Sequence, residues 1–268
     1  MRVAIPDPGY PAYSNGARLA RMRPARFPLD PHGGWLPDWE QWPRGSRLLY
    51  LNYPNNPTGA VAGLDELSGA IDRARDQGFV IAYDNAYSEI TFGGERAPSI
   101  LQRPNAREHA VEFHSLSKTL GIPGWRIGFA VGGAERIAAL TALKSHADSG
   151  AAMPLQAAAS RALAEYDADG WPTEVRRSIE EYGHRLRSLA TGLTEHGWPV
   201  DMPRGTLYLW QRAPHGDGAR FAERLLSQHR ILVTPGAAFG RAGRQFVRWS
   251  VTAPPEDVEE ALLRLGSE

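Results

Sequence analysis

Glu112-Phe-His-Ser115-Leu-Ser117-Lys118-Thr-Leu-Gly-Ile-Pro-Gly-Trp-Arg126-Ile-Gly-Phe129 is the stretch of sequence that decides the fold. An apolar segment ends in two hydroxyls and a lysine, and after a turn marked by glycine and proline an arginine opens a second apolar segment. Two hydroxyls, an amine and a guanidinium at the carboxyl end of a strand suit a ligand that carries an anion and a carbonyl. We therefore expect a binding site at this strand end.

The lysine in this stretch stands out by composition. Of the 30 Lys+Arg residues only Lys118 and Lys144 are lysine. Arginine stays protonated and cannot form a Schiff base, whereas a lysine amine can lose its proton and form one. A lysine kept at position 118 indicates chemistry that needs an amine, while Lys144 is interpreted as a solvated residue at a helix end.

Size and charge exclude several classes of protein. A chain of 268 residues can bury a core and form one large or two smaller domains. The formal net charge is +0 and there is no basic run, so we expect no nucleic-acid partner. No apolar segment approaches the roughly 20 residues that span a bilayer, and the polar start is no signal peptide, so no membrane is expected. The chain lacks cysteine, which fits a cytoplasmic protein, and its eight histidines are scattered, so no metal site is predicted.

Alternating elements predict an α/β fold. Apolar runs predict strands at 3–5, 48–51, 79–83, 109–113 and 127–131, with an extended segment near 26–29. Helical spacing predicts helices at 12–20 and from 64 to Gly78. Polar residues follow the strand ends, which is typical of an open, mostly parallel sheet flanked by helices. From residue 134 the pattern is mostly helical, with a hairpin-like region at 206–210 and strands at 231–233 and 246–251. We predict a large α/β domain at 1–150, then linking helices and a smaller C-terminal α+β domain at 151–268.

Four motifs in this order resemble the class I/II aminotransferases, which are fold-type-I enzymes dependent on pyridoxal 5′-phosphate (PLP). They are Asn56-Pro-Thr-Gly59, Asp84-Asn-Ala-Tyr87, Ser115-Leu-Ser-Lys118 followed by Arg126, and Arg248 near the C-terminus. One motif alone would be weak, but four in register over almost the whole chain are specific. The residues of these motifs are similar to those of bacterial LL-diaminopimelate and aspartate-type aminotransferases.

The resemblance implies a role for each matched residue. Lys118 would bind the cofactor covalently and then move the proton between the substrate Cα and the cofactor, and Asp84 would bind the pyridinium nitrogen. Arg248, with Asn56, would bind the substrate α-carboxylate and orient the Cα–H bond. The remaining contacts to the cofactor would come from its stacking partner Tyr10, from Asn56 and Tyr87 at O3′, and from Ser115, Ser117 and Arg126 at the phosphate.

Every one of these residues also has a simpler interpretation. Asn56-Pro-Thr-Gly59 could be only a tight turn, Asp84 a helix N-cap, and the two arginines surface residues. Ser115-x-x-Lys118 also matches the nucleophile motif of β-lactamases, but no Lys-Thr-Gly element follows it. Neither glycine fingerprint of a nucleotide site is present. Coincidence of the whole set is the less favoured interpretation.

The sequence departs from the family at its start. Family members carry an upstream segment that includes a phosphate-cradling loop at a helix N-terminus, a strong source of anion affinity. A misplaced start codon, a split gene and a genuine short form all remain open. We expect a PLP-dependent aminotransferase that acts on an amino acid and a 2-oxo acid as a homodimer. The alternatives are lyase, decarboxylase or amino-acid oxidase chemistry on the same scaffold, or a catalytically impaired remnant that binds a partner or ligand.

Overall fold

The computed structural model describes residues 1–94, 96–166 and 170–266, and the chain divides into two compact units. Unit 1 takes residues 1–47, 55–61 and 181–268, and unit 2 takes 48–54 and 62–180. This grouping follows spatial contacts and joins the first 47 residues to the C-terminal ones. The predicted functional division at residue 150 is a different kind of boundary and stays a prediction.

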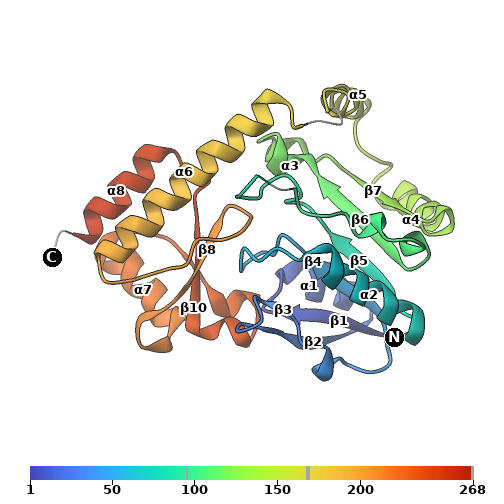
Figure 1. Ribbon diagram of the computed structural model, residues 1–268, viewed down its shortest axis with the longest axis horizontal. Helices are drawn as coiled ribbons and strands as arrows, with labels where there is room; N and C mark the ends of the chain where they lie inside the picture. Colours follow the sequence, from blue (N-terminus) through green and yellow to red (C-terminus); the bar gives the residue numbers. More distant parts are fainter. Residues whose placement is uncertain (95, 167–169, 267–268) are drawn as a thin grey trace. The chain divides into compact units, whose positions relative to one another are not determined.

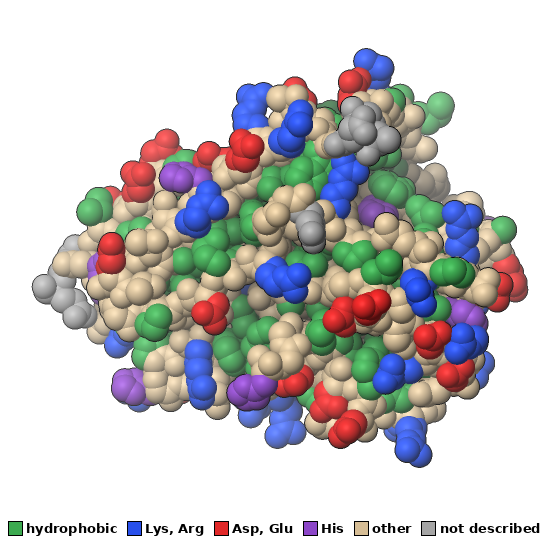
Figure 2. Space-filling view, viewed as in Figure 1, with side chains coloured by type: hydrophobic (Ala, Val, Ile, Leu, Met, Phe, Trp, Pro, Cys, Tyr) green, Lys and Arg blue, Asp and Glu red, His purple; other side chains and the backbone are tan. Residues whose placement is uncertain are grey.

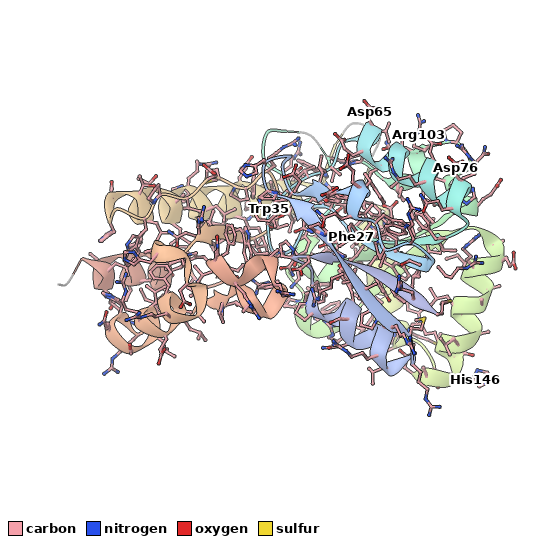
Figure 3. The ribbon with its side chains drawn as sticks, turned by 90° about the horizontal axis from the view of Figure 1, so that it is seen from below. Phe27, Trp35, Asp65, Asp76, Arg103 and His146 are labelled. Atoms are coloured by element: carbon pink, nitrogen blue, oxygen red, sulfur yellow. The ribbon has the colours of Figure 1, made fainter. Side chains whose placement is uncertain are left out.

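The N-terminal part of unit 1 contains three neighbouring strands (Figure 1). Strand β1 (Arg2–Asp7) pairs in parallel with β2 (Arg23–Asp30), and helix α1 (Pro11–Leu19) connects the two. Strand β2 also pairs antiparallel with β3 (Leu36–Pro37). Phe27 of β2 is 1% exposed and packs against Trp39 and Trp42. Figure 3 marks Phe27 on β2 and Trp35 in the turn that follows it. The predicted helix at 12–20 is confirmed, and the predicted extended segment at 26–29 lies within β2.

The C-terminal part of unit 1 is an antiparallel sheet covered by helices. Strands β8 (Tyr208–Arg212), β10 (Phe246–Ser250) and β9 (Thr234–Pro235) lie in that order. Helices α7 (Gly218–His229), α8 (Pro255–Leu265) and α6 (Thr173–Glu195, from residue 181 in this unit) accompany it. Gly192 of α6 allows the close approach of α8, because a Cβ there would lie 2.5 Å from the Leu262 side chain.

Two predictions for this part are wrong. The region at 206–210 forms no hairpin, because β8 pairs with β10, which begins more than thirty residues later. Residues 231–233 are not a strand, and pairing with β10 begins at Thr234. Such partners are chosen by packing and not by the local sequence.

Unit 2 contains four strands, two of which end at predicted motifs. Strands β4 (Ser46–Asn52), β5 (Val80–Asp84) and β6 (Ala110–Ser115) run parallel, and β7 (Gly128–Gly132) is antiparallel to β6. Helix α2 (Leu64–Gln77) connects β4 to β5 and ends at Gly78, whose φ of 69° is left-handed and favours glycine. The prediction of a mostly parallel sheet flanked by helices is confirmed.

The helices of unit 2 differ sharply in how much they bury. Helix α2, with Asp65 and Asp76 near its two ends in Figure 3, buries five residues against the sheet. Helix α4 (Ala134–Ala147), near whose end His146 lies, and helix α5 (Met153–Leu163) bury none. Leu143 and Met153 are 70% and 81% exposed. Packing against the rest of the unit therefore holds α2 but contributes little to α4 and α5.

The described surface carries both signs of charge. On the face shown in Figure 2, lysine and arginine side chains are interspersed with aspartate and glutamate, and neither sign forms a continuous field. Among the described residues no helix is long and apolar enough to cross a membrane.

Candidate active site

Two parallel strands of unit 2 end side by side with polar residues. Asp84 is the last residue of β5 and Ser115 the last of β6, and Asp84 is paired in register with Phe113. The Asp84 carbonyl oxygen accepts a hydrogen bond from Asn52 Nδ2 at 2.7 Å, which ties the end of β5 to the end of β4. Because carboxyl ends of parallel strands meet at one edge, Asp84 and Ser115 open onto the same edge of the sheet.

The short helix α3 (Leu116–Thr119) begins directly at the end of β6 and carries Lys118. Ser115 caps it, since its hydroxyl oxygen accepts a hydrogen bond from the Ser117 backbone amide at 3.3 Å. Ser117 is buried and Lys118 is half-buried. Within the described part of the chain the Lys118 amine makes no hydrogen bond or ion pair. Lys144 is a solvated residue near the end of α4, as predicted, and it pairs with Asp148 at 2.6 Å. Lys118 is therefore the lysine whose amine is left for chemistry.

Tyr87 and Arg126 are the other predicted cofactor residues in unit 2. Tyr87 is 5% exposed and lies in the turn after β5. Arg126 is exposed and has a left-handed backbone with φ of 53°, an uncommon conformation for a residue other than glycine. Its Nη1 donates to the Pro123 carbonyl oxygen at 3.0 Å. The predicted role of Arg126 at a phosphate stays a prediction.

Unit 1 brings Asn56 and Arg248 together, although 192 residues separate them. Arg248 Nη1 donates to Asn56 Oδ1 at 2.8 Å, and Asn56 is 5% exposed. The guanidinium lies 4.0 Å from the ring centroid of Tyr208 and 4.8 Å from that of Phe239. Its Nε is buried and has no hydrogen-bond partner among the described residues. A guanidinium fixed in this way, with a donor left over, suits a carboxylate ligand.

Phe239, whose ring packs near the Arg248 guanidinium, is held by a network that the sequence did not reveal. Asp7 at the end of β1 is 8% exposed and accepts hydrogen bonds from the backbone amides of Arg241 and Ala242 at 3.2 and 3.1 Å. The Phe239 carbonyl oxygen accepts from Gly9 N at 2.9 Å and from Arg26 Nη1 at 3.1 Å. The turn that positions the Phe239 ring against Arg248 is therefore fastened to the N-terminal strands.

Tyr10 follows the same strand end in unit 1. It is 43% exposed and its ring meets Tyr13 edge-on, with centroids 5.7 Å apart. An aromatic ring with one face in solvent can stack on a planar ligand. The predicted set is thus divided: Tyr10, Asn56 and Arg248 belong to unit 1, and the remaining predicted residues, Asp84, Tyr87, Ser115, Ser117, Lys118 and Arg126, belong to unit 2.

The donor set fits PLP in its chemistry. The cofactor presents an aldehyde, a basic ring nitrogen, a phenolic oxygen and a phosphate. Unit 2 offers a half-buried amine without a partner at Lys118, a carboxylate at Asp84, and two hydroxyls at Ser115 and Ser117 at one strand edge. The aldehyde, the ring nitrogen and the phosphate thus each have a residue of matching chemistry in unit 2.

A buried glutamate is the main feature of unit 2 that the motifs did not reveal. Glu112 lies within β6 and is 0% exposed. The only sequence signal was a charged residue inside an otherwise apolar strand, two positions before His114. Two of its hydrogen-bond partners, Asn85 and Ser99, lie 27 and 13 residues away in the sequence.

Comparison with known proteins is consistent with these features. Residues 1–265 match the family model described as aminotransferase class I and II. Over 268 residues the chain is 41% identical to the LL-diaminopimelate aminotransferase of Desulforudis audaxviator. The aligned region covers 98% of this chain and 67% of that protein. The corresponding protein of Moorella thermoacetica is 41% identical over 266 residues, 97% of this chain and 67% of its own length.

Solved structures are similar over the same range. The substrate-bound BacF structure from Bacillus subtilis matches 98% of this chain and 67% of its own with a TM-score of 0.92 at 33% identity. A probable N-succinyldiaminopimelate aminotransferase from Thermus thermophilus covers 98% of this chain and 70% of its own, with a TM-score of 0.89 at 35% identity. The chain thus spans about two thirds of the length of the proteins to which it is similar.

Proposed function

This chain belongs to the aminotransferase class I and II family, and from that premise we propose how its residues move an amino group between an L-amino acid and a 2-oxo acid. Members of the family use PLP, which when bound supplies an electron sink for the negative charge that develops at the substrate Cα. The observation that carries the proposal is the half-buried amine of Lys118, which has no partner among the described residues, at the strand end where Asp84 also lies.

Residues of unit 2 hold the cofactor and move the proton. Lys118 would hold the cofactor through its amine, and the same amine would move the proton between the substrate Cα and the cofactor. The Asp84 carboxylate keeps a proton on the ring nitrogen by pairing with it. The hydroxyls of Ser115 and Ser117 and the guanidinium of Arg126 bind the phosphate.

Residues of unit 1 bind what lies around the reacting carbon. Arg248 holds the substrate α-carboxylate, which aligns the Cα–H bond for proton transfer. Asn56 Oδ1 already fixes one guanidinium nitrogen at 2.8 Å. The Asn56 amide binds the phenolic oxygen together with the Tyr87 hydroxyl of unit 2, and the Tyr10 ring stacks on the cofactor.

For the substrate we propose a diamino dicarboxylate of the diaminopimelate type. Support comes from relatives named LL-diaminopimelate aminotransferase at 41% identity. Comparison of LL-diaminopimelate with aspartate and an aromatic amino acid as amino donors tests this choice, and a preference for either of the last two would contradict it.

We further propose that the protein acts in the cytoplasm as a homodimer, because sites of the family lie between subunits. Sedimentation equilibrium would give twice the 29.4 kDa chain mass for a dimer, and a monomeric mass with cofactor bound would contradict the proposal.

The scarcity of lysine allows a sharp test. The purified protein is incubated with PLP and reduced with borohydride, and its peptides are weighed by mass spectrometry. The peptide with Lys118 should carry the cofactor, and Lys118→Ala should lose both the label and the visible absorption of the bound cofactor. Lys144→Arg removes the other lysine and should change neither. A label on Lys144 or on no lysine at all would contradict the proposal.

Product analysis separates transamination from other reactions of the same cofactor. With an amino donor alone, a transaminase converts one equivalent and stops, and a 2-oxo acid restores turnover. Sustained release of ammonia or carbon dioxide without a 2-oxo acid would indicate lyase, oxidase or decarboxylase chemistry.

A further inference from the structure

Glu112 is a charged side chain inside the sheet of unit 2. It lies in the middle of β6 and is 0% exposed. A carboxylate withdrawn from water is costly unless hydrogen bonds replace the lost hydration. A glutamate in this place therefore needs a compensating set of donors.

Three donors from three segments meet this carboxylate. Asn85 Nδ2 lies 2.8 Å and His114 Nε2 2.9 Å from Oε1, and the Ser99 hydroxyl lies 2.5 Å from Oε2. Burial alone would raise the pKa of Glu112, but the hydrogen bonds from His114, Ser99 and Asn85 outweigh it and lower the pKa. The carboxylate is thus ionised and satisfied at neutral pH.

Two of these donors adjoin residues of the proposed site. Asn85 comes directly after Asp84, and its backbone amide donates to the Phe113 carbonyl oxygen at 2.9 Å. His114 comes directly before Ser115, and its ring stacks on Phe129 with centroids 4.7 Å apart. Ser99 comes from a separate short helix, so it joins the carboxylate without belonging to either strand end.

We infer that Glu112 is a positioning residue for the cofactor site: by binding Asn85 and His114 it fixes the end of β5 that carries Asp84 relative to the end of β6 that carries Ser115 and Lys118. The inference rests on the proposed function for its link to PLP. Successive side chains of a strand point to opposite faces of the sheet, so Glu112 lies on the same face as His114 and on the opposite face from Phe113. Its oxygen atoms serve the strand ends and touch no reacting atom.

Four variants test this role. Glu112→Leu keeps the bulk but accepts no hydrogen bond, and it should weaken PLP binding at least tenfold. Glu112→Gln retains an acceptor for Asn85 and His114 and an amide donor for Ser99, so it should restore the PLP dissociation constant to within about threefold of the wild-type value. His114→Phe keeps the stacked ring, loses one bond to Glu112, and should weaken binding about fivefold.

Ser99→Ala is the matched control. It removes a hydrogen bond from the same carboxylate but leaves both strand ends attached, so the protein should melt earlier and bind PLP as the wild type does. Equal weakening of PLP binding in Ser99→Ala and Glu112→Leu would reduce Glu112 to a purely structural residue. If Glu112→Leu fails to fold, an unchanged PLP affinity in His114→Phe would overturn the inference by itself.

A second readout needs no cofactor. In Glu112→Leu, hydrogen exchange should accelerate at the Asn85 amide. It should stay slow at the Ile81 amide, which bonds the His109 carbonyl oxygen at the other end of the same strands. Absence of PLP binding by the wild type would contradict the proposed function, while this exchange pattern would still decide whether Glu112 fixes the strand ends. Equal acceleration at both amides, or at neither, would overturn the inference.

Discussion

The guanidinium of Arg248 and the amide of Asn56 form a hydrogen bond of 2.8 Å between two motifs that are 192 residues apart in sequence. The bond turns one arginine nitrogen toward a fixed acceptor, while Tyr208 and Phe239 pack near the guanidinium. An arginine held in this way loses less side-chain entropy when a carboxylate binds, because it is already ordered.

Arg248→Lys should lower kcat/KM for the amino donor about 100-fold. Lysine keeps the charge but lacks the planar fork, and the loss of a charge-assisted pair of hydrogen bonds is worth about 2–3 kcal/mol. Steady-state kinetics give the ratio. Arg212→Lys on β8, an exposed arginine bonded to Gln245, is the control and should leave kcat/KM unchanged. A decrease in kcat/KM of less than tenfold for Arg248→Lys would mean that Arg248 does not bind the substrate.

Gly240→Ala should destabilise the protein by about 2–3 kcal/mol. Gly240 has φ of 139°, and a Cβ there would clash with Asp7 Oδ1. Gly34→Ala is a control with φ of 71° but open space around the new methyl group, and should cost only about 1 kcal/mol. Urea unfolding measures both. Similar losses in the two variants would show that backbone conformation alone, and not the contact with Asp7, sets the cost.

Asn85→Asp should cost about 3 kcal/mol of unfolding free energy. The new carboxylate would replace a donor that lies 2.8 Å from Glu112, and two buried like charges repel each other. Asn105→Asp, an exposed asparagine at a turn, makes the same chemical change and should be nearly neutral. Thermal unfolding at pH 7 compares them, and a neutral Asn85→Asp would mean that the Asn85 side chain does not bind Glu112 in solution.

The lowered pKa of Glu112 predicts a dependence of stability on pH. Because the pKa is lower in the folded state, the contribution of Glu112 is fully present above the unfolded value, near 4.5, and is lost as the pH falls through the folded value. His114 and Tyr83 are the titratable groups that face it. Unfolding by urea between pH 7 and pH 3 should therefore show a difference between wild type and Glu112→Gln that shrinks below about pH 4. A difference that stays constant would contradict the lowered pKa.

Local elements could be read from the sequence because their signals are local. Gly78 ends α2 with a left-handed φ, and apolar runs gave β1, β4, β5 and β6. The partner of β8 could not be read, because β10 is distant in sequence and pairing is decided by packing. For the same reason residues 231–233 were taken as a strand.

The candidate site divides along the same line. Lys118, Asp84 and Ser115 could be assigned because motif spacing and strand ends are visible in the chain itself. The bonds of Glu112 to residues 27 and 13 positions away, and that of Asp7 to Ala242, needed the fold. Residues that position others leave little trace in a single sequence, since their meaning depends on what they touch.

Helices α4 and α5 bury no residue, so we expect them to unfold locally before the sheet does. Isolated helices of fewer than about 12–15 residues are marginal in water, and these two have 14 and 11 residues. Without burial they should fray and exchange their amide protons while the sheet stays closed. A protease needs an unwound segment, so brief digestion with trypsin should cut after Arg136, Lys144 and Arg161 before it cuts after Arg73 and Arg75 of α2, which buries five residues.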